Sequence, residues 1–295
     1  MDFLNKLNNK TVGILGLGYL GSNLLNYLSE KKEEFNIKII PIDKENINII
    51  ESTNFDYFLN CAGPGANFRD DILGTIDSNI SLLVYLLKNL KVNDNFLALS
   101  STRIYGFSPD DKMFFDENCF QCSNHLSLDY IYDGSKKLLE STVMNYSEKL
   151  NYKTTVVRLS NVYGKFDKLD ESTFIKRMFK CKLNNANLET NQNRESKKDY
   201  VYISDAIEGI LRALLLSKKS DIFNIASGVS YSIDEISKII GVKIDYKNES
   251  REVFFSNISV KKAKDFLDFN PKVDIDEGLK KILNEECNYG PDKTI

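Results

Sequence analysis

Histidine is almost absent from the sequence, which contains only His125 among 295 residues. Structural zinc sites usually take four cysteine or histidine ligands, and a Ser/His/Asp triad would have to rely on this single side chain. Histidine-based catalysis and metal binding are therefore disfavoured, and we expect His125 to lie in an exposed loop.

Cysteine is also scarce, and its five residues are scattered: Cys61, Cys119, Cys122, Cys181 and Cys287. An odd number without regular spacing is typical of reduced thiols in a cytosolic enzyme rather than of a disulfide framework. Cys119 and Cys122 form one CxxC pair, but no second pair accompanies it. We therefore predict that the protein binds no metal.

The sequence lacks both a basic excess and a long apolar run. A formal net charge of -3 gives no basic surface for nucleic acid. No stretch of about 18 apolar residues is present, and the opening segment MDFLNKLNNK does not contain the apolar core of a secretory signal. These absences predict a cytoplasmic protein with no nucleic-acid partner and no membrane partner.

Short apolar runs alternate with helical patterns through the first half of the chain. The runs have the length of buried strands, and the patterns between them repeat apolar residues every three or four positions. The clearest runs are TVGILG, NIKIIPID, DYFLNCAG, NFLALSS and KTTVVRLS. Such alternation predicts an α/β fold with a doubly wound parallel sheet.

The pattern changes beyond Gly164. Charged, asparagine-rich stretches there separate isolated helical patterns over residues 204–218 and 233–241. A smaller lobe joined to the sheet accounts for this change, since the sequence shows no internal repeat.

Gly16, Gly18 and Gly21 form a GxGxxG pattern directly after the first apolar run and at the start of a helical pattern. There the backbone can approach a pyrophosphate, and the helix N-terminus favours its negative charge. Asp43 ends the next apolar run, where a carboxylate would accept hydrogen bonds from ribose hydroxyls and repel a 2′-phosphate. The pattern favours NAD over NADP, although Lys44 weakens that preference and a plain turn aspartate is the alternative.

Tyr132 and Lys136 form a YxxxK pair, and on a helix the two side chains would lie one turn apart on one face. The ammonium would then lower the pKa of the phenol, which would make it a useful proton donor or acceptor near neutral pH. Two other tyrosine and lysine pairs share this spacing, one after the glycine turn and one near the C-terminus. Only Tyr132 follows an apolar strand that ends in hydroxyl side chains, so we select this pair.

The strand before Tyr132 ends in Ser100, Ser101 and Thr102. Their hydroxyls would emerge at the carboxyl edge of the sheet, where open α/β sheets bind ligands. We predict that Ser101 polarises a substrate carbonyl. The alternative is that these residues cap the strand or satisfy a turn.

With these motifs in order, the chain resembles the extended short-chain dehydrogenases/reductases, the family of NAD-dependent nucleotide-sugar epimerases and dehydratases. The matching segments span nearly the whole chain: GLGYLGS, DSNISLLVYLL, SSTRIYG, YDGSKKLLE, VVRLSNVYG, KDYVYISDAIEGIL, FNIASG and KKAKDFLDFNPKVDIDEGLKKIL. The resemblance implies a Rossmann-like domain for the cofactor, a smaller C-terminal lobe for the substrate and a homodimer. We assign residues 1–165 to the cofactor domain, with 199–230 returning to it, and residues 166–198 and 231–295 to the substrate-binding lobe.

The resemblance also implies roles for individual residues. Ser101, Tyr132 and Lys136 would be catalytic, and Asn79 would support the lysine. The residues assigned to the cofactor are Gly16, Gly18, Tyr19, Leu20, Gly21, Asp43, Lys44, Ala62, Asn79, Ser100, Tyr132 and Lys136.

The residues assigned to the substrate are Thr102, Arg103, Asn161, Lys198 and Arg251. Three departures from the family pattern accompany this assignment. The glycine turn has GxGxxG rather than TGxxGxxG spacing, and Lys198 stands where the family usually has an arginine with its bidentate fork. Thr102 and Arg103 occupy the positions of the acidic pair of 4,6-dehydratases, so dehydration is disfavoured.

These patterns predict NAD-dependent oxidoreduction at C4 of a nucleotide-linked sugar by a 4-epimerase that keeps its cofactor. Within the enzyme class, the alternative is a nucleotide-4-keto-sugar reductase or a nucleotide-sugar 4-dehydrogenase that exchanges cofactor at each turnover. Outside it, the alternative is a dinucleotide-sensing binding protein, which would have little need for the three catalytic residues together.

Overall fold

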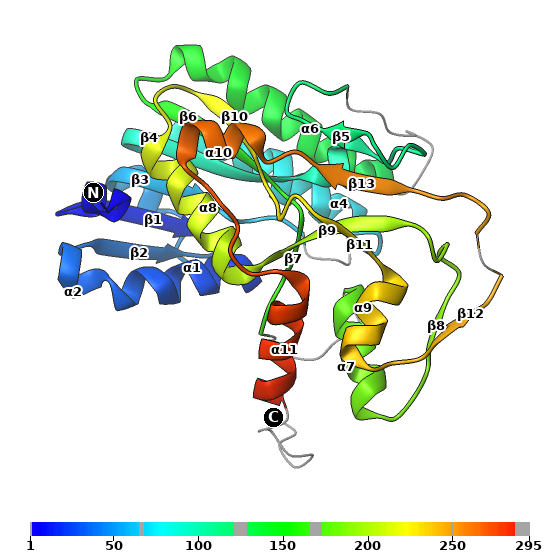
Figure 1. The fold of residues 1–295 in the computed structure, drawn as a ribbon. Helices are drawn as coiled ribbons and strands as arrows, with labels where there is room; N and C mark the ends of the chain where they lie inside the picture. Colours follow the sequence, from blue (N-terminus) through cyan, green and yellow to red (C-terminus); the bar gives the residue numbers. More distant parts are fainter. Residues whose placement is uncertain (1, 65–67, 121–128, 166–172, 249, 287–295) are drawn as a thin grey trace.

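Six parallel strands form the central sheet in the computed structural model of the chain (Figure 1). Their order across the sheet is β10-β6-β4-β3-β1-β2. The strands are β1 (Thr11–Leu15), β2 (Lys38–Ile42), β3 (Asn54–Asn60), β4 (Lys91–Ser101), β6 (Lys153–Leu159) and β10 (Asp221–Ile225). The five apolar runs of the first half of the sequence supply all of these strands except β10. The predicted Rossmann-like, doubly wound α/β class is confirmed.

The structure describes residues 2–64, 68–120, 129–165, 173–248 and 250–286. Cys122, His125 and Cys287 lie outside these ranges, and so does part of the predicted segment 166–198. Within the ranges, every helix is too short or too polar to cross a membrane.

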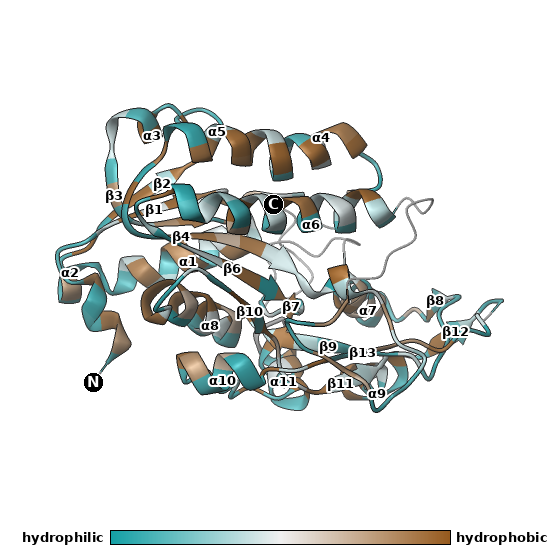
Figure 2. Cartoon of the chain, turned by 90° about the horizontal axis from the view of Figure 1, so that it is seen from above, coloured by the Kyte–Doolittle hydropathy of each residue, from teal (hydrophilic) through white to brown (hydrophobic). Residues whose placement is uncertain are grey.

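Helices cover both faces of the sheet (Figure 2). Leu97 and Leu99 of β4 pack into the core beneath α1 and α8, whereas Phe96 and Ala98 pack into the core beneath α5 and α6. This division follows from the alternation of side chains along a strand. The four covering helices are α1 (Tyr19–Glu30), α5 (Leu82–Asn89), α6 (Asp129–Tyr146) and α8 (Ile203–Leu216).

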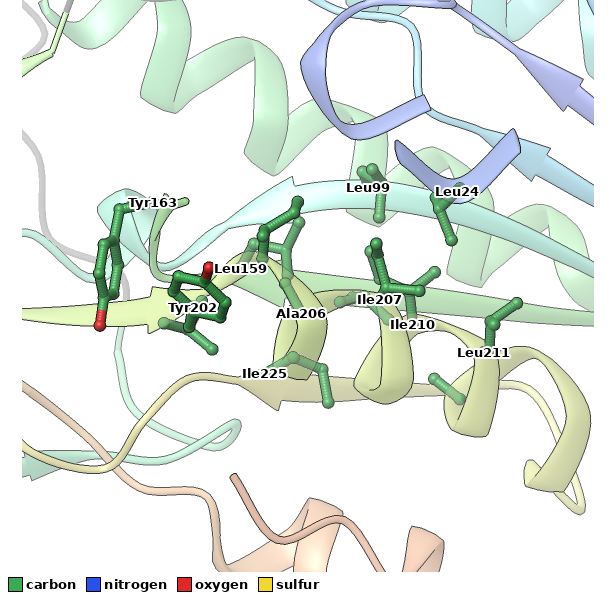
Figure 3. Close-up of a cluster of buried hydrophobic side chains, with 14 of the residues drawn as sticks. Leu24, Leu99, Leu159, Tyr163, Tyr202, Ala206, Ile207, Ile210, Leu211 and Ile225 are labelled. Carbon is green, nitrogen blue, oxygen red and sulfur yellow. The ribbon is translucent and has the colours of Figure 1, made fainter. Parts of the chain in front are cut away.

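Helix α8 supplies much of the larger core. Figure 3 shows its side chains between β4, β10 and α1, where Ala206, Ile210 and Leu211 are fully buried and Ile207 nearly so. The three- and four-residue spacing of these side chains is that of one helix face. Strand β10 is thus part of the central sheet and helix α8 packs on it, although both follow the segment that we assigned to the substrate lobe. The domain boundaries themselves stay a prediction.

A second sheet surrounds strand β9, which pairs with β7, β11 and β13. Its strands are β5 (Phe114–Phe115), β7 (Asn161–Tyr163), β9 (Lys197–Tyr202), β11 (Ser230–Ser232) and β13 (Phe255–Ile258). Strands β8 (Leu188–Thr190) and β12 (Ile244–Tyr246) form a separate parallel pair. The remaining helices are η1 (Phe3–Leu7), α2 (Lys32–Phe35), α3 (Ile49–Ser52), α4 (Ile72–Ile76), η2 (Asp77–Ser81), η3 (Thr102–Tyr105), η4 (Ser147–Lys149), α7 (Phe174–Leu183), α9 (Ile233–Ile240), α10 (Lys261–Leu267) and α11 (Ile275–Glu286).

The order of the strands reverses at β1, which has β2 on one side and β3 on the other. Open α/β sheets bind ligands at such a switch point, outside the carboxyl ends of the strands. The carboxyl end of β1 carries the glycine turn, that of β3 carries Cys61, Ala62 and Gly63, and that of β4 carries Ser100 and Ser101. The topology therefore brings the predicted motifs to one edge of the sheet.

Candidate active site

The glycine turn packs tightly against the end of β3. Gly16 has a positive φ of 89°, and a Cβ there would lie 2.5 Å from the backbone nitrogen of Ala62. A Cβ on Gly21 would lie 2.0 Å from the carbonyl oxygen of Gly16. Glycine is therefore required at both positions for the turn to close. A Cβ on Gly18, in contrast, would meet no atom of the described residues within 4 Å.

Gly18 is the N-cap residue of α1, and no side chain caps this end of the helix. The first N–H groups of a helix have no partner within the helix, and its N-terminus favours an anion. The open side of Gly18 lets an incoming group approach these N–H groups closely. The turn therefore fits the pyrophosphate of a dinucleotide, as predicted from its glycine spacing.

Asp43 follows β2 and forms a local turn. Its Oδ1 accepts hydrogen bonds from the backbone N–H groups of Glu45 at 2.8 Å and Asn46 at 3.3 Å. Both Asp43 and Lys44 are exposed at the sheet edge. The turn geometry is that of the plain turn aspartate which the sequence left open, and the roles of Asp43 and Lys44 in ribose binding stay predictions.

Lys136 is buried beneath the carboxyl end of β4. Its ammonium donates a hydrogen bond to the Leu99 carbonyl oxygen at 3.0 Å and lies 5.8 Å from the ring centroid of Tyr132. Burial lowers the pKa of Lys136 to about 8, although the nearby Glu140 carboxylate and Cys61 thiol oppose this shift. The pair thus lies on one face of α6, as the spacing predicts.

The predicted effect of Lys136 on the phenol is wrong for the protein alone. Burial raises the pKa of Tyr132, and the influences that lower it come from a hydrogen bond with Ser101 and from the charge of Arg103. The ammonium of Lys136 is directed toward the backbone of β4 instead. Desolvation of the phenol therefore outweighs the neighbouring charges.

Asn79 lies at the centre of η2, a π-helical turn between α4 and α5, and is fully buried. Its Nδ2 donates to the Ser135 hydroxyl at 2.9 Å, and this hydroxyl donates to the carbonyl oxygen of Tyr132 at 2.8 Å. Its Oδ1 has no hydrogen-bond partner among the described residues. A π-turn of this kind often marks a functional site.

Gly63 leaves open space beside two of these groups. A Cβ on Gly63 would lie 3.2 Å from Asn79 Oδ1 and 3.2 Å from Lys136 Nζ. An acceptor and a donor therefore face the same position, which suits a sugar hydroxyl because it can both donate and accept. These residues fit the nicotinamide ribose of NAD. Tyr19, Leu20 and Ala62 adjoin the turn, and their contacts with the cofactor stay predictions.

A buried polar network lies behind Ser101. Ser100 donates its hydroxyl to Glu140 at 2.5 Å, and Arg158 pairs with the same carboxylate at 2.7 Å. Arg158 also donates to the hydroxyl of Tyr105 at 2.6 Å. Because successive side chains of a strand point to opposite faces, Ser100 turns inward while Ser101 stays at the edge. The hydroxyl of Ser100 thus binds Glu140, and its predicted role at the cofactor stays a prediction.

Arg103 is held against the first turns of α6. Its Nε lies 3.2 Å from Asp133 Oδ1, and its Nη2 lies 3.3 Å from Asp129 Oδ2. Its guanidinium also lies over the rings of Phe68, at 5.2 Å, and Tyr132, at 5.7 Å. Thr102, predicted to face the substrate, is only 4% exposed.

The other predicted substrate residues are distributed along the second sheet. Asn161 is exposed and donates to the carbonyl oxygen of Asp199 at 2.7 Å. Burial and the charges of Arg103 and Arg69 lower the pKa of Lys198, so these three cations lie close together. Arg251 is exposed between β12 and β13, and among the described residues no hydrogen bond or ion pair links it to the others. The substrate roles stay predictions.

Several residues of this site were missed by sequence reasoning. The sequence could have indicated that Glu140 lies near Lys136, since it follows Lys136 by four residues on the same helix face. Asp129, Asp133 and Gly63 carry no signal of their own. Their roles depend on the packing of α6 against the ends of β3 and β4.

The two turn glycines lead to different expected defects. Gly18→Ala should raise the Kd for NAD at least about tenfold, because the methyl group occupies the approach to the helix N-terminus. It should change the melting temperature by only a few degrees, as for other N-cap changes. Gly16→Ala should lower both affinity and melting temperature, since its Cβ overlaps the backbone of Ala62. NADH fluorescence titrations and thermal melts measure both; unchanged NAD affinity in Gly18→Ala would contradict the assignment.

Lys136 should make stability depend on pH. Its folded pKa of about 8 lies below the ordinary 10.5, so its destabilising effect is complete below pH 8 and disappears as the pH rises toward 10.5. Relative to Lys136→Met, the wild type should gain about 2 kcal/mol of unfolding free energy between pH 7 and pH 9.5. Urea denaturation of both proteins at the two pH values measures this difference, and a constant difference would show that the lysine is not desolvated.

Comparison with known proteins places this site in a family. The NAD dependent epimerase/dehydratase family model matches residues 12–226. A dTDP-4-dehydro-6-deoxyglucose reductase of Escherichia coli is 27% identical over an alignment of 225 positions that covers 74% of this chain and 68% of the relative. A UDP-glucuronate 4-epimerase of Thermodesulfobacterium geofontis is 27% identical over an alignment of 305 positions that covers 96% of this chain and 90% of the relative.

The fold agrees with this placement. The epimerase Mth375 of Methanothermobacter thermautotrophicus has a TM-score of 0.83 at 21% identity, covering 98% of this chain and 96% of that one. The resemblance seen in the sequence motifs is confirmed. The chain belongs to the NAD-dependent epimerase/dehydratase family and is an NAD-dependent enzyme of the extended short-chain dehydrogenase/reductase type.

Proposed function

We propose that this enzyme is a nucleotide-sugar 4-epimerase that retains NAD. The observation that carries the proposal is the meeting of Ser101, Tyr132 and Lys136 at one sheet edge, beside a glycine turn that fits a dinucleotide. The similarity to a UDP-glucuronate 4-epimerase over nearly the full length supports it.

In the proposed reaction, the sugar lies with its C4 oxygen between the hydroxyls of Ser101 and Tyr132. Tyr132 accepts the C4 hydroxyl proton during oxidation and returns a proton to the same oxygen during reduction. Ser101 donates a hydrogen bond that holds the carbonyl oxygen. Hydride transfer from and to C4 is the chemistry that NAD would supply when bound. Lys136 and Asn79 are the residues that would hold the nicotinamide ribose beside Gly63.

Dehydration has no support at this site. Thr102 is buried and Arg103 is paired with Asp133, so the two positions after Ser101 supply no carboxyl group to protonate a leaving hydroxyl. A 4-keto-sugar reductase or 4-dehydrogenase would use the same three residues. The similarity to a dTDP-4-dehydro-6-deoxyglucose reductase over 74% of this chain keeps this second candidate open.

Tyr132→Phe should lower turnover at least about a hundredfold, because the proton carrier is removed. The assay follows purified enzyme without added NAD on UDP-glucuronate, UDP-glucose and UDP-galactose, with the sugar products detected by NMR. Tyr27→Phe is the matched control, since Tyr27 shares the YxxxK spacing but lies on α1. We expect the control to keep near-normal turnover; near-normal turnover in Tyr132→Phe would overturn the mechanism.

The same assay separates the two candidate activities. A 4-epimerase retains NAD through gel filtration and interconverts 4-epimers with no net change in NADH absorbance. A reductase loses its cofactor and oxidises added NADH or NADPH when a nucleotide-4-keto sugar is supplied. The second pattern without the first would replace the 4-epimerase proposal by the reductase.

We also propose that the protein forms a homodimer through α4 and α6, which pack against each other on one side of the sheet (Figure 2). Apolar side chains are exposed on both helices: Ile72 at 39%, Leu73 at 77% and Leu138 at 52%. Exposed apolar surface is a common mark of protein–protein interfaces. The cytoplasmic location expected from the sequence stays a prediction.

Leu73→Asp combined with Leu138→Asp should convert the dimer to a monomer of 33.7 kDa, because each charge would have to be desolvated at the interface. Sedimentation velocity measures the mass. The control is Leu183→Asp, which changes a side chain of α7 that is 57% exposed and should leave the dimer intact. A wild-type protein that sediments as a monomer would refute the interface.

A further inference from the structure

Two cations lie at similar distances from the ring of Tyr132. The guanidinium carbon of Arg103 is 5.7 Å from the ring centroid, and the ammonium of Lys136 is 5.8 Å from it. Burial brings the pKa of Lys136 to about 8, so this charge disappears at a pH at which a tyrosine is still protonated. Arginine keeps its proton throughout this range. Arg103 and Lys136 thus place two cations beside the phenol.

The guanidinium of Arg103 is fixed from several directions. Asp133 and Asp129 on α6 bind two of its nitrogens, at 3.2 and 3.3 Å. Phe68 lies beneath it at 5.2 Å, and the ring of Phe68 in turn packs against Tyr132 with centroids 4.9 Å apart. Only a third of the Arg103 side chain is exposed. The charge is therefore held beside the phenol rather than free to move in solvent.

We propose that Arg103 is a positioning residue for Tyr132, which it holds against Phe68 while its fixed charge favours the deprotonated phenol. The proposal rests on the proposed role of Tyr132 as the proton carrier. It differs from the predicted role of Arg103 as a substrate ligand, because the groups that bind the guanidinium are Asp129 and Asp133 of this chain.

The charged surroundings of the phenol define how Arg103 acts. Asp133 raises the pKa of Tyr132, whereas Arg103 and the hydroxyl of Ser101 lower it. Because Arg103 also neutralises Asp133, its removal acts twice in the same direction. The groups around the phenol and its arginine are Ser101 at the end of β4, Arg103 on η3, Asp129, Asp133 and Lys136 on α6, Arg69 after Phe68, and Lys198 on β9.

Arg69 offers a matched control for this charge. It lies over the same Phe68 ring, at 4.6 Å, and pairs with the same Asp129, at 2.6 Å. Yet its charge is not among the influences on the pKa of Tyr132. Arg69→Gln thus removes an equal charge from the same cluster, without removing the one that lies over the tyrosine.

The test is a direct titration of the residue at position 132 in the full chain. Tyr132→difluorotyrosine gives a phenol that ionises several pH units below tyrosine, inside the range in which proteins stay folded, and ¹⁹F NMR reports its midpoint. Arg103→Gln should raise this midpoint by about one pH unit. Arg103→Lys should restore most of the shift, and Arg69→Gln should move the midpoint by less than about 0.3 unit.

An unchanged midpoint in Arg103→Gln, or an equal rise in Arg69→Gln, would overturn the proposal. If Arg103→Gln does not fold, Asp133→Asn is the second variant. Because Asp133 raises the pKa of Tyr132, the midpoint of the residue at position 132 should fall in this variant, and a constant midpoint would contradict the proposal. In the wild-type tyrosine background, the acidic limb of the kcat/KM profile, which reports the proton acceptor, should move to higher pH by the same amount in Arg103→Gln. Since the titration needs no substrate, failure to find any nucleotide-sugar turnover would refute the proposed function and leave this result standing.

Discussion

The buried ion pair between Arg158 of β6 and Glu140 of α6 sets the geometry on which the site depends. The guanidinium binds both carboxylate oxygens, and the hydroxyls of Ser100 and Tyr105 complete the network. A charge buried this deeply is strongly unfavourable without its partner. Helix α6, which carries Tyr132 and Lys136, therefore cannot slide along β6 without breaking the pair, and the hydrogen bond from Ser100 to Glu140 ties the same helix to β4. The ion pair and this hydrogen bond thus fix the position of α6 relative to the ends of β4 and β6.

The central sheet could be predicted because its strands are apolar runs bounded by glycines or polar turns. The tyrosine and lysine pair could be selected because one helix fixes their separation. Strands β5 and β7, in contrast, have only two and three residues, too few to show an alternating pattern. The clamp on Arg103 was also beyond reach, since Asp129 and Asp133 lie 26 and 30 residues further along the chain. Only the packing of α6 on the edge of β4 brings them together.

The same burial that orders the site also opposes its ionisation. Sequence reasoning assigned Lys136 a charge and inferred a more acidic phenol, but desolvation acts on both groups and in both cases favours the neutral form. The spacing of two residues along a helix says nothing about their exposure to water, so the sequence alone could not show that burial raises the pKa of Tyr132. In the protein alone, the side chains of Tyr132 and Lys136 are therefore held in place while burial favours their neutral forms.

The central sheet is completed late in the chain. Strand β10, which forms the edge beside β6, follows α7, β8, β9 and α8 in sequence, and β9 belongs to the other sheet. During synthesis, the outer edge of β6 consequently has no neighbour until these intervening segments have left the ribosome. Truncation after β6 would leave hydrogen-bonding groups on an open strand edge, which invites pairing with another chain. The two halves of the molecule are therefore interleaved, and neither can be removed as a separate unit.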